Sequence, residues 1–314
     1  MSLESIKKNL HPFWFKKLPR TKNSELHTNT LTRRLFLRWL LGLPFLFSFP
    51  FYVRETAADS LTSLMREGRG PISNFFKGEE LVYEIGFWLF KRAALGKLNF
   101  YEMEKKGHYM AVLQAETLGV LGWVTRYRKD TYRSTMVEID EGRRFRSLSF
   151  EEDAKIGNKL RKRIHHFDYQ EGKWIQLRLR KDGSMGRTEE KIPPGMVYDD
   201  FLTASFNFRY GVYGEIERGK KYTIATFPRK GASSYEVNVA GKEEEEKRKR
   251  SEKSKDGKDF YVKLYLDPEI THSKEGLIEG WLSKELYPIE GMIKDVGLFG
   301  DVKGTLIKKL KAEG

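Results

Sequence analysis

The chain has 314 residues, with 58 Lys or Arg against 44 Asp or Glu, and a net charge of +14. Because it contains no cysteine, disulfides, thiol catalysis, iron–sulfur clusters and cysteine zinc sites are excluded. The first 58 residues hold ten Lys or Arg and three Glu, so they carry about half of the net charge. The rest of the chain is long enough for one sizeable domain, and its modest charge does not predict nucleic-acid binding.

An export signal is the first feature in chain order. The run Thr32-Arg33-Arg34-Leu35-Phe36-Leu37-Arg38 resembles the twin-arginine consensus. The signal residues are Arg33, Arg34, Phe36 and Leu37. An apolar stretch at 35–53 follows, and Ala57-Ala58 supplies small residues for cleavage. We expect residues 1–58 to be a leader with a disordered region at 1–31, recognised by the twin-arginine or the general export machinery, and the mature protein to be periplasmic.

Two other interpretations of the apolar stretch are open. An uncleaved signal would tether the protein to the inner membrane, and membrane contact would then be limited to this segment. Pro44 and Pro50 interrupt the stretch, which is short for a spanning helix. A buried core helix is the other alternative, and the same prolines and the missing polar face disfavour it.

The remaining sequence predicts a short helix at 59–67, a linker to residue 75, and one mainly β domain at 76–314. Apolar and polar residues alternate in six runs, as in strands with one buried face. These runs are 80–90, 109–114, 173–181, 221–227, 235–239 and 260–266. Turns with glycine or charged residues separate most of them. So many strands predict an antiparallel sheet that curls into an open or spiral barrel.

One helix is expected to interrupt the sheet near residues 200–211. Asp199 can cap this helix, Gly211 can end it, and an aromatic stripe lies along one side. Such a helix suits a plug inside a curled sheet. The candidate ligand-binding residues on it are Phe201, Ser205, Phe208 and Arg209. The arginine either clamps an anionic head group or anchors the helix to a carboxylate of the sheet.

Residues 241–259 form a charged insertion. Four glutamates at 243–246 each precede a basic residue at 247–250 by four positions, which favours a solvated helical turn. We expect this insertion to contribute no core residue.

Four motifs, taken in order, resemble the bacterial DUF3108 family. They are Gly78-Glu79-Glu80-Leu81-Val82-Tyr83-Glu84-Ile85, Arg128-Lys129-Asp130-Thr131-Tyr132-Arg133-Ser134, Asp200-Phe201-Leu202-Thr203-Ala204-Ser205-Phe206-Asn207-Phe208-Arg209 and Trp281-Leu282-Ser283-Lys284-Glu285, followed by Pro288 and Gly304. The resemblance implies an exported envelope protein of unknown function with a sheet distantly similar to the half-open barrels of lipoprotein carriers. Glu285 stands where the family usually has Asp, and the insertion at 241–259 is longer than the family pattern.

Motifs for enzyme chemistry are absent from the sequence. It has no H-E-x-x-H, G-x-S-x-G, P-loop or dinucleotide motif, so we expect no cofactor and no metal. His165 and His166 are adjacent, and on a strand they would face opposite sides, which disfavours a shared metal. Asp199, Asp200 and Glu285 are candidate carboxylates for a hydrolase, although capping also explains an aspartate at a helix start.

A basic patch completes the candidate sites. It consists of Lys155, Lys159, Arg161, Lys162 and Arg163, near Arg143, Arg144 and Arg146. The patch suits an acidic partner, and solvated strand ends are the alternative. Our leading hypothesis is a non-enzymatic periplasmic module that binds a lipid, a lipid-bearing chain or an envelope partner. The alternatives are an envelope polysaccharide or lipid hydrolase, and a polyanion-binding module.

Overall fold

The computed structural model describes residues 70–311, except 88–89, 230–231, 253–256, 272 and 297–299. All described residues lie in one compact unit, Glu55–Gly314. The predicted export signal and the helix predicted at 59–67 therefore lie outside the described residues. No helix in the described ranges is long and apolar enough to cross a membrane.

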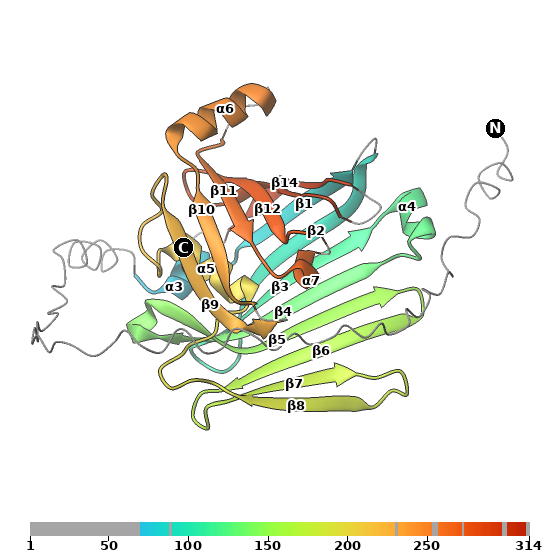
Figure 1. The fold of residues 1–314 in the computed structure, drawn as a ribbon, viewed down its shortest axis with the longest axis vertical. Coiled ribbons are helices and arrows are strands. Elements are labelled where there is room, and N and C mark those ends of the chain that lie inside the picture. The colour runs from blue at the N-terminus through green and yellow to red at the C-terminus, as the bar shows by residue number, and fades with distance from the viewer. Residues whose placement is uncertain are drawn as a thin grey trace, which may run out of the picture. The chain divides into compact units, whose positions relative to one another are not determined.

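Fourteen described strands form one antiparallel sheet (Figure 1). The first eight are β1 (Glu80–Phe87), β2 (Phe90–Glu102), β3 (His108–Thr117), β4 (Lys129–Ile139), β5 (Arg144–Ile156), β6 (Lys159–Asp168), β7 (Lys173–Leu179) and β8 (Met185–Lys191). The other six are β9 (Lys221–Arg229), β10 (Ala232–Val239), β11 (Phe260–Tyr265), β12 (Leu277–Leu282), β13 (Pro288–Ile293) and β14 (Val302–Leu310). The mainly β, antiparallel prediction is confirmed.

The strand order is β8-β7-β6-β5-β4-β3-β2-β1-β14-β13-β12-β11-β10-β9. Consecutive strands pair except β8 and β9, which are the two edges, and β1 also pairs with β14, so the sheet stays open. The chain between these edges contains the helix α5 (Phe201–Tyr210). The remaining elements are α3 (Ile72–Phe76), α4 (Gly119–Val124), the 3-10 turn η2 (Asp140–Gly142), α6 (Lys242–Glu252) and α7 (Pro268–Thr271).

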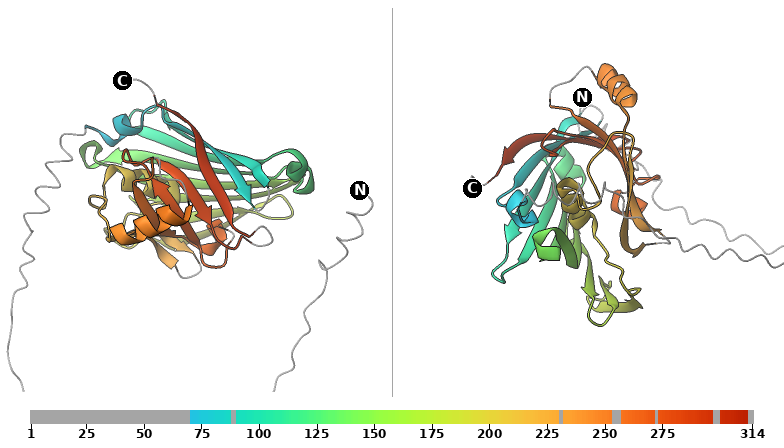
Figure 2. Two further views of the ribbon diagram at one scale, coloured as in Figure 1. Left: turned by 90° about the horizontal axis from the view of Figure 1, so that it is seen from above. Right: turned by 90° about the vertical axis from the view of Figure 1, so that its left-hand side faces the viewer.

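We call strands β1 to β8 one arm of the curled sheet and strands β9 to β14 the other. The helix α5 lies between these two arms (Figures 1 and 2). Asp200, not the predicted Asp199, caps it by accepting hydrogen bonds from the amides of Leu202 and Thr203. Gly211 ends it with a φ of 93°, a left-handed conformation that favours glycine. Eight of its ten residues are buried, because apolar clusters cover it on both sides.

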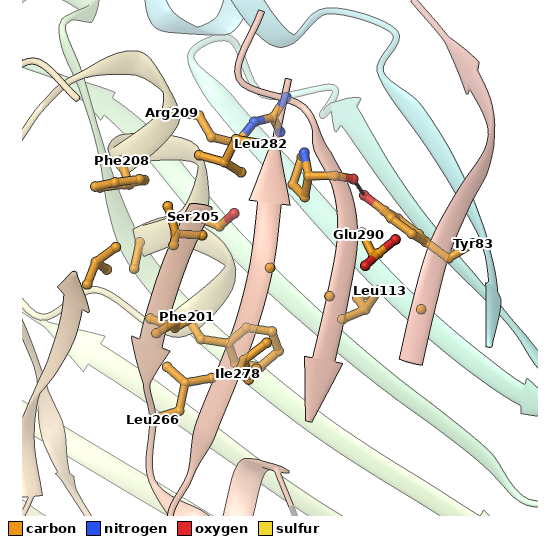
Figure 3. Close-up of a pocket in the computed structure, with 18 of the residues that line it drawn as sticks. Tyr83, Leu113, Phe201, Ser205, Phe208, Arg209, Leu266, Ile278, Leu282 and Glu290 are labelled. Atoms are coloured by element: carbon orange, nitrogen blue, oxygen red, sulfur yellow. Dashed lines mark hydrogen bonds between the residues drawn. The ribbon is translucent and has the colours of Figure 1, made fainter. Parts of the chain in front are cut away.

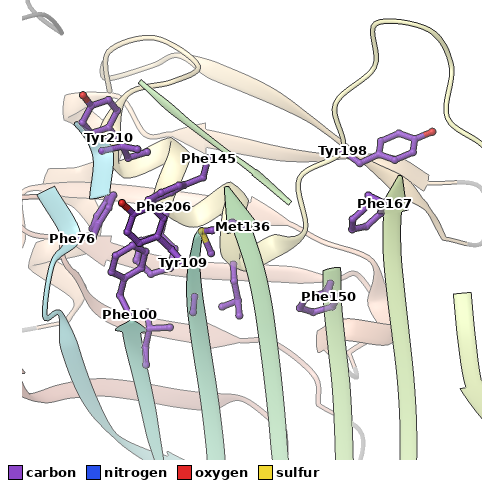
Figure 4. Packing of buried hydrophobic residues seen from close by; sticks show 14 of the residues in the cluster. Phe76, Phe100, Tyr109, Met136, Phe145, Phe150, Phe167, Tyr198, Phe206 and Tyr210 are labelled. Atoms are coloured by element: carbon purple, nitrogen blue, oxygen red, sulfur yellow. The ribbon is translucent and has the colours of Figure 1, made fainter. Parts of the chain in front are cut away.

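One cluster joins α5 to α3 and strands β1 to β7. Phe206 and Tyr210 of α5 pack there among aromatic rings from the sheet (Figure 4). The other cluster joins Ala204 and Phe208 to strands β9 to β12. Because α5 packs apolar side chains into a cluster on each side, its burial holds the two arms of the sheet around it.

Two segments are more closely packed than expected. Residues 72–75 of the predicted linker form α3 together with Phe76, the first residue of the predicted domain, and Ile72 and Phe76 are fully buried. The charged insertion forms α6, and none of its described residues belongs to a hydrophobic cluster, as expected, but the helix is not wholly solvated. Glu245 of α6 is buried, and it pairs with Arg218 and accepts a hydrogen bond from the amide of Tyr261. Long charged side chains can cover apolar surface with their aliphatic stems.

Candidate functional site

An apolar cavity of about 360 Å³ lies between α5 and the sheet (Figure 3). Its walls come from both arms: β1 to β4 on one side and β9 to β14 on the other. Side chains such as Ile85, Leu113 and Ile278 are only half-buried, although they face the interior of the curled sheet. The cavity is therefore a solvent-accessible pocket beside the core and not an enclosed void.

A row of glycines forms part of the cavity floor. Gly280, Gly291 and Gly304 are cross-strand neighbours on β12, β13 and β14, and all three line the cavity together with Gly96 of β2. Partners in a sheet point to the same face, so the row leaves a strip without side chains beneath the helix. The cavity exists where these missing side chains would otherwise meet α5.

Only part of this row is required by backbone packing. A Cβ atom at Gly280 would lie 2.5 Å from the carbonyl oxygen of Glu290, so any side chain is excluded there. At Gly291 the nearest atom would be 3.9 Å away, and at Gly304 it would be 4.0 Å away. None of the three has a positive φ, so the backbone at Gly291 and Gly304 can accept a side chain that projects into the cavity.

The four candidate ligand-binding residues on α5 all line this cavity. Phe201, Ser205 and Phe208 face it from the helix, opposite Leu282 and Ile278 of β12 (Figure 3). The sequence pattern therefore selected residues that lie on one wall of the cavity. The fourth residue, Arg209, reaches the cavity at the end nearest Leu282, and its charge is paired with Glu79.

Arg209 anchors α5 to the sheet through a buried ion pair. Its two terminal nitrogens donate to both carboxylate oxygens of Glu79 at 2.7 and 2.6 Å, and both side chains are 2% exposed. Its Nε donates to the carbonyl oxygen of Leu286, and its guanidinium lies 4.8 Å from the ring centre of Phe76. The anchoring alternative is the one that the structure shows.

Asp200 links the start of α5 to strands β4 and β5. Its carboxylate accepts five hydrogen bonds: two from helix amides, one from the Thr203 hydroxyl, and one each from Ser134 and Ser147. Burial raises the pKa of Asp200, and the hydroxyl and amide donors oppose this rise. All of these contacts are structural, because Asp200 does not line the cavity.

Asp199 lies in a separate polar cluster. Its Oδ2 accepts hydrogen bonds from Arg144 at 2.9 Å, Tyr213 at 2.5 Å and Asn207 at 3.3 Å. Burial raises the pKa of Asp199 to about 6, and the Arg144 charge and the Tyr213 hydroxyl limit the rise. The third candidate carboxylate, Glu285, is exposed and accepts from Ser283, so the three do not converge on one cleft.

The side chain of Asn207 connects α5 to the backbone of β5 through two hydrogen bonds. Its amide oxygen accepts from the amide of Phe145, and its amide nitrogen donates to the carbonyl oxygen of the same residue, each at 2.9 Å. The side chain thus satisfies both backbone groups of one strand residue in the interior.

The two adjacent histidines behave as the alternation predicts. His165 is buried against Trp174, whose indole nitrogen donates to its Nδ1, and His166 is exposed. No group of three acidic or histidine residues suited to a metal occurs in the described ranges.

The predicted basic patch is divided by the structure. Arg143, Arg144 and Arg146 lie at or just before the start of β5, roughly 30–40 Å along the strand from Lys155 at about 3.4 Å per residue. Within the patch, Lys162 and Arg163 pair with acidic residues of β5, whereas Lys155, Lys159 and Arg161 are exposed. The neighbouring rings of Phe145, Phe150 and Phe167 belong to the core.

Sequence reasoning missed the glycine row and the partners of the helix. Glycine inside an alternating strand signals a bulge or a close approach, so Gly280, Gly291 and Gly304 carried a usable signal. Glu79, Ser134 and Ser147 had none, because only the fold brings them to α5.

These features define an open antiparallel sheet with a buried helix and an apolar cavity beside it. Residues 82–306 match the model of the family described as Protein of unknown function (DUF3108), and the chain belongs to this family. The resemblance noted in the sequence is thereby confirmed. No curated protein and no solved structure matches the chain.

The Arg209 anchor predicts a large stability effect. Arg209→Met leaves the Glu79 carboxylate buried without its cation, and we expect a loss of about 3–5 kcal/mol in the free energy of unfolding. Urea denaturation followed by circular dichroism measures it. The control is Lys97→Met, which removes a half-exposed pair with Glu80 and should cost less than about 1 kcal/mol. Equal losses in the two variants would contradict the anchoring role.

Asp199 predicts a pH dependence of stability. Its pKa is about 6 in the folded protein, above about 3.9 in an unfolded chain. The folded state therefore holds the proton more tightly, and this contribution to stability is present below about pH 4 and lost as the pH rises through about 6. Between these pH limits, the free energy of unfolding of the wild type should fall by on the order of 2–3 kcal/mol relative to that of Asp199→Asn. A difference between the two proteins that does not change with pH would refute the assignment.

Proposed function

We propose that the protein is exported to the periplasm and that its cavity binds the apolar chain of a lipid or of a lipid-bearing molecule. The observation that carries this proposal is the strip of glycines beneath α5, which leaves a solvent-accessible apolar pocket in an otherwise packed interior. Its volume of about 360 Å³ falls in the range of about 300–1,000 Å³ of ligand pockets.

The charges on the cavity wall favour an uncharged occupant. Two charged residues line it, and both are neutralised: Arg209 by Glu79, and Glu290 by Lys258 and Lys303. A charged ligand group inside would lose its hydration without gaining a free partner. The ligand's polar head is therefore expected to stay outside, and its chain to lie between α5 and the glycine strip.

Binding is favoured over hydrolysis by the state of the carboxylates. Asp200 accepts hydrogen bonds as a helix cap, and Asp199 is held by Arg144, Tyr213 and Asn207. A hydrolase of the two-carboxylate kind needs both groups beside the substrate, and neither lines the cavity. The proposal is thus a binding module that does not transform its ligand.

Filling the glycine strip tests the proposal. Gly304→Val adds a side chain that the backbone can accept, and its bulk would occupy the space proposed for the chain. We expect at least roughly tenfold weaker binding of cis-parinaric acid, a fluorescent fatty acid, with stability retained. The matched control is Thr305→Val, an exposed neighbour on the same strand, which should bind as the wild type does. A wild type that does not bind this probe, or equal binding by both variants, would overturn the proposal.

Export has its own test. Arg33→Lys with Arg34→Lys preserves charge but removes the paired arginines, so we expect the precursor to accumulate in the cytoplasm. Cell fractionation and immunoblotting measure the distribution. Arg20→Lys, in the same leader, is the control and should leave export unchanged. Normal export of the double variant would exclude the twin-arginine route, and a cytoplasmic wild type would exclude export.

A further inference from the structure

One end of the sheet gathers exposed aromatic and basic side chains. In an antiparallel meander alternate connections lie at the same end, so the β1–β2, β3–β4 and β5–β6 connections are neighbours here (Figure 1). We call this end the rim and define it by six residues. They are Phe90, Trp123, Tyr127, Lys155, Lys159 and Arg161.

The aromatic side chains of the rim are exposed to an unusual degree. Trp123 is 67% exposed, Tyr127 is 58% exposed and Phe90 is 47% exposed. Burial of large aromatic side chains is strongly favourable, so three exposed on adjoining connections indicate a surface that meets another phase or molecule.

Hydrogen bonds bring the three connections together. The amide of Leu118, just before α4, donates to the carbonyl oxygen of Ala93 in β2 at 2.8 Å. The amide of Gly157, in the β5–β6 turn, donates to the carbonyl oxygen of Arg126 at 2.9 Å. The exposed aromatics and the basic hairpin therefore adjoin at one end of the sheet, with Lys159 and Arg161 on one face of the hairpin and Lys155 on the other.

The cations of the rim have no ion-pair partner among the described residues. Lys155, Lys159 and Arg161 are exposed, and within the described ranges no carboxylate lies in ion-pair distance of them. This separates them from Lys162 and Arg163, one or two residues further along β6, which pair with β5. Unpaired cations beside exposed aromatics leave the rim positively charged.

We propose that the rim docks on the surface of an anionic lipid bilayer. Trp and Tyr side chains are favoured at the membrane–water interface, because their rings are apolar and their polar edges remain hydrated. Lys and Arg near an anionic surface add roughly 1 kcal/mol each, or about fivefold in partitioning. Bases of nucleic acid would stack on aromatics set along a groove, whereas Trp123 and Tyr127 lie on the connection at the sheet end that contains α4.

The rim also lies at one end of the cavity. Ile85 precedes the β1–β2 connection, Ala115 precedes α4, and Leu266 and Ile278 flank the α7 connection at the same sheet end. Docking here would bring the cavity to the membrane surface. This inference goes beyond the proposed ligand and does not require it, because the rim contacts are separate from the cavity lining.

The absence of cysteine allows a site-specific test on the full chain. Trp123→Cys is labelled with the environment-sensitive dye NBD, and vesicles of phosphatidylcholine with or without phosphatidylglycerol are added. Lys105→Cys, exposed on the β2–β3 turn at the opposite end, is the matched label position. We expect a blue shift and stronger emission at position 123 with anionic vesicles only, and no change at position 105.

Charge reversal supplies the second measurement. Lys155→Glu with Lys159→Glu and Arg161→Glu should weaken the response at position 123 at least roughly tenfold, and increasing salt should weaken it in the unreversed protein. Gly304→Val should leave it unchanged, which separates this proposal from the cavity. The proposal would be overturned if the label at position 123 did not respond to vesicles that bind the protein, or if the label at position 105 responded equally. It would also be overturned if the response were equal without anionic lipid or did not depend on salt.

Discussion

The ion pair between Glu79 and Arg209 is the contact on which the interior depends. The helix α5 is enclosed by the sheet, so every polar group that it carries must find a partner inside the protein. Arg209 reaches the residue just before β1, Asp200 reaches hydroxyls on β4 and β5, and Asn207 reaches the backbone of β5. Three separate polar contacts therefore fix the position of one helix against three regions of the sheet.

With α5 held in this way, the space beneath it is set by the side chains of the facing strands. Large rings fill the side toward α3 and β2, where Phe76, Phe100 and Phe206 are in contact. Glycines face the opposite side, on β12, β13 and β14, and at these glycines the sheet leaves a gap beneath the helix. The same rigid helix thus has a packed side and a hollow side, because its anchors prevent it from moving to close the gap.

The two ends of the sheet differ in how completely their apolar side chains are covered. At one end the core continues through α3 and the rings around Phe100, and apolar side chains are covered. At the other end the aromatics of α4 and its following turn stay exposed, and nearby cations have no ion-pair partner among the described residues. The cavity proposed to bind a ligand therefore runs toward the end of the sheet that carries the rim.

The sequence alone predicted a mainly β antiparallel fold, six of its strands, the helix near 200–211 and the family, because alternation, turn glycines and short motifs are local in the chain. It also singled out Phe201, Ser205 and Phe208, since helical spacing places them on one side. Only the tertiary structure decided that Arg209 pairs with Glu79, that Asp200 and not Asp199 is the cap, that α6 is packed on the sheet and that the basic patch is divided. These outcomes depend on residues far apart in the chain, and the pairing of distant strands in one sheet brings them together.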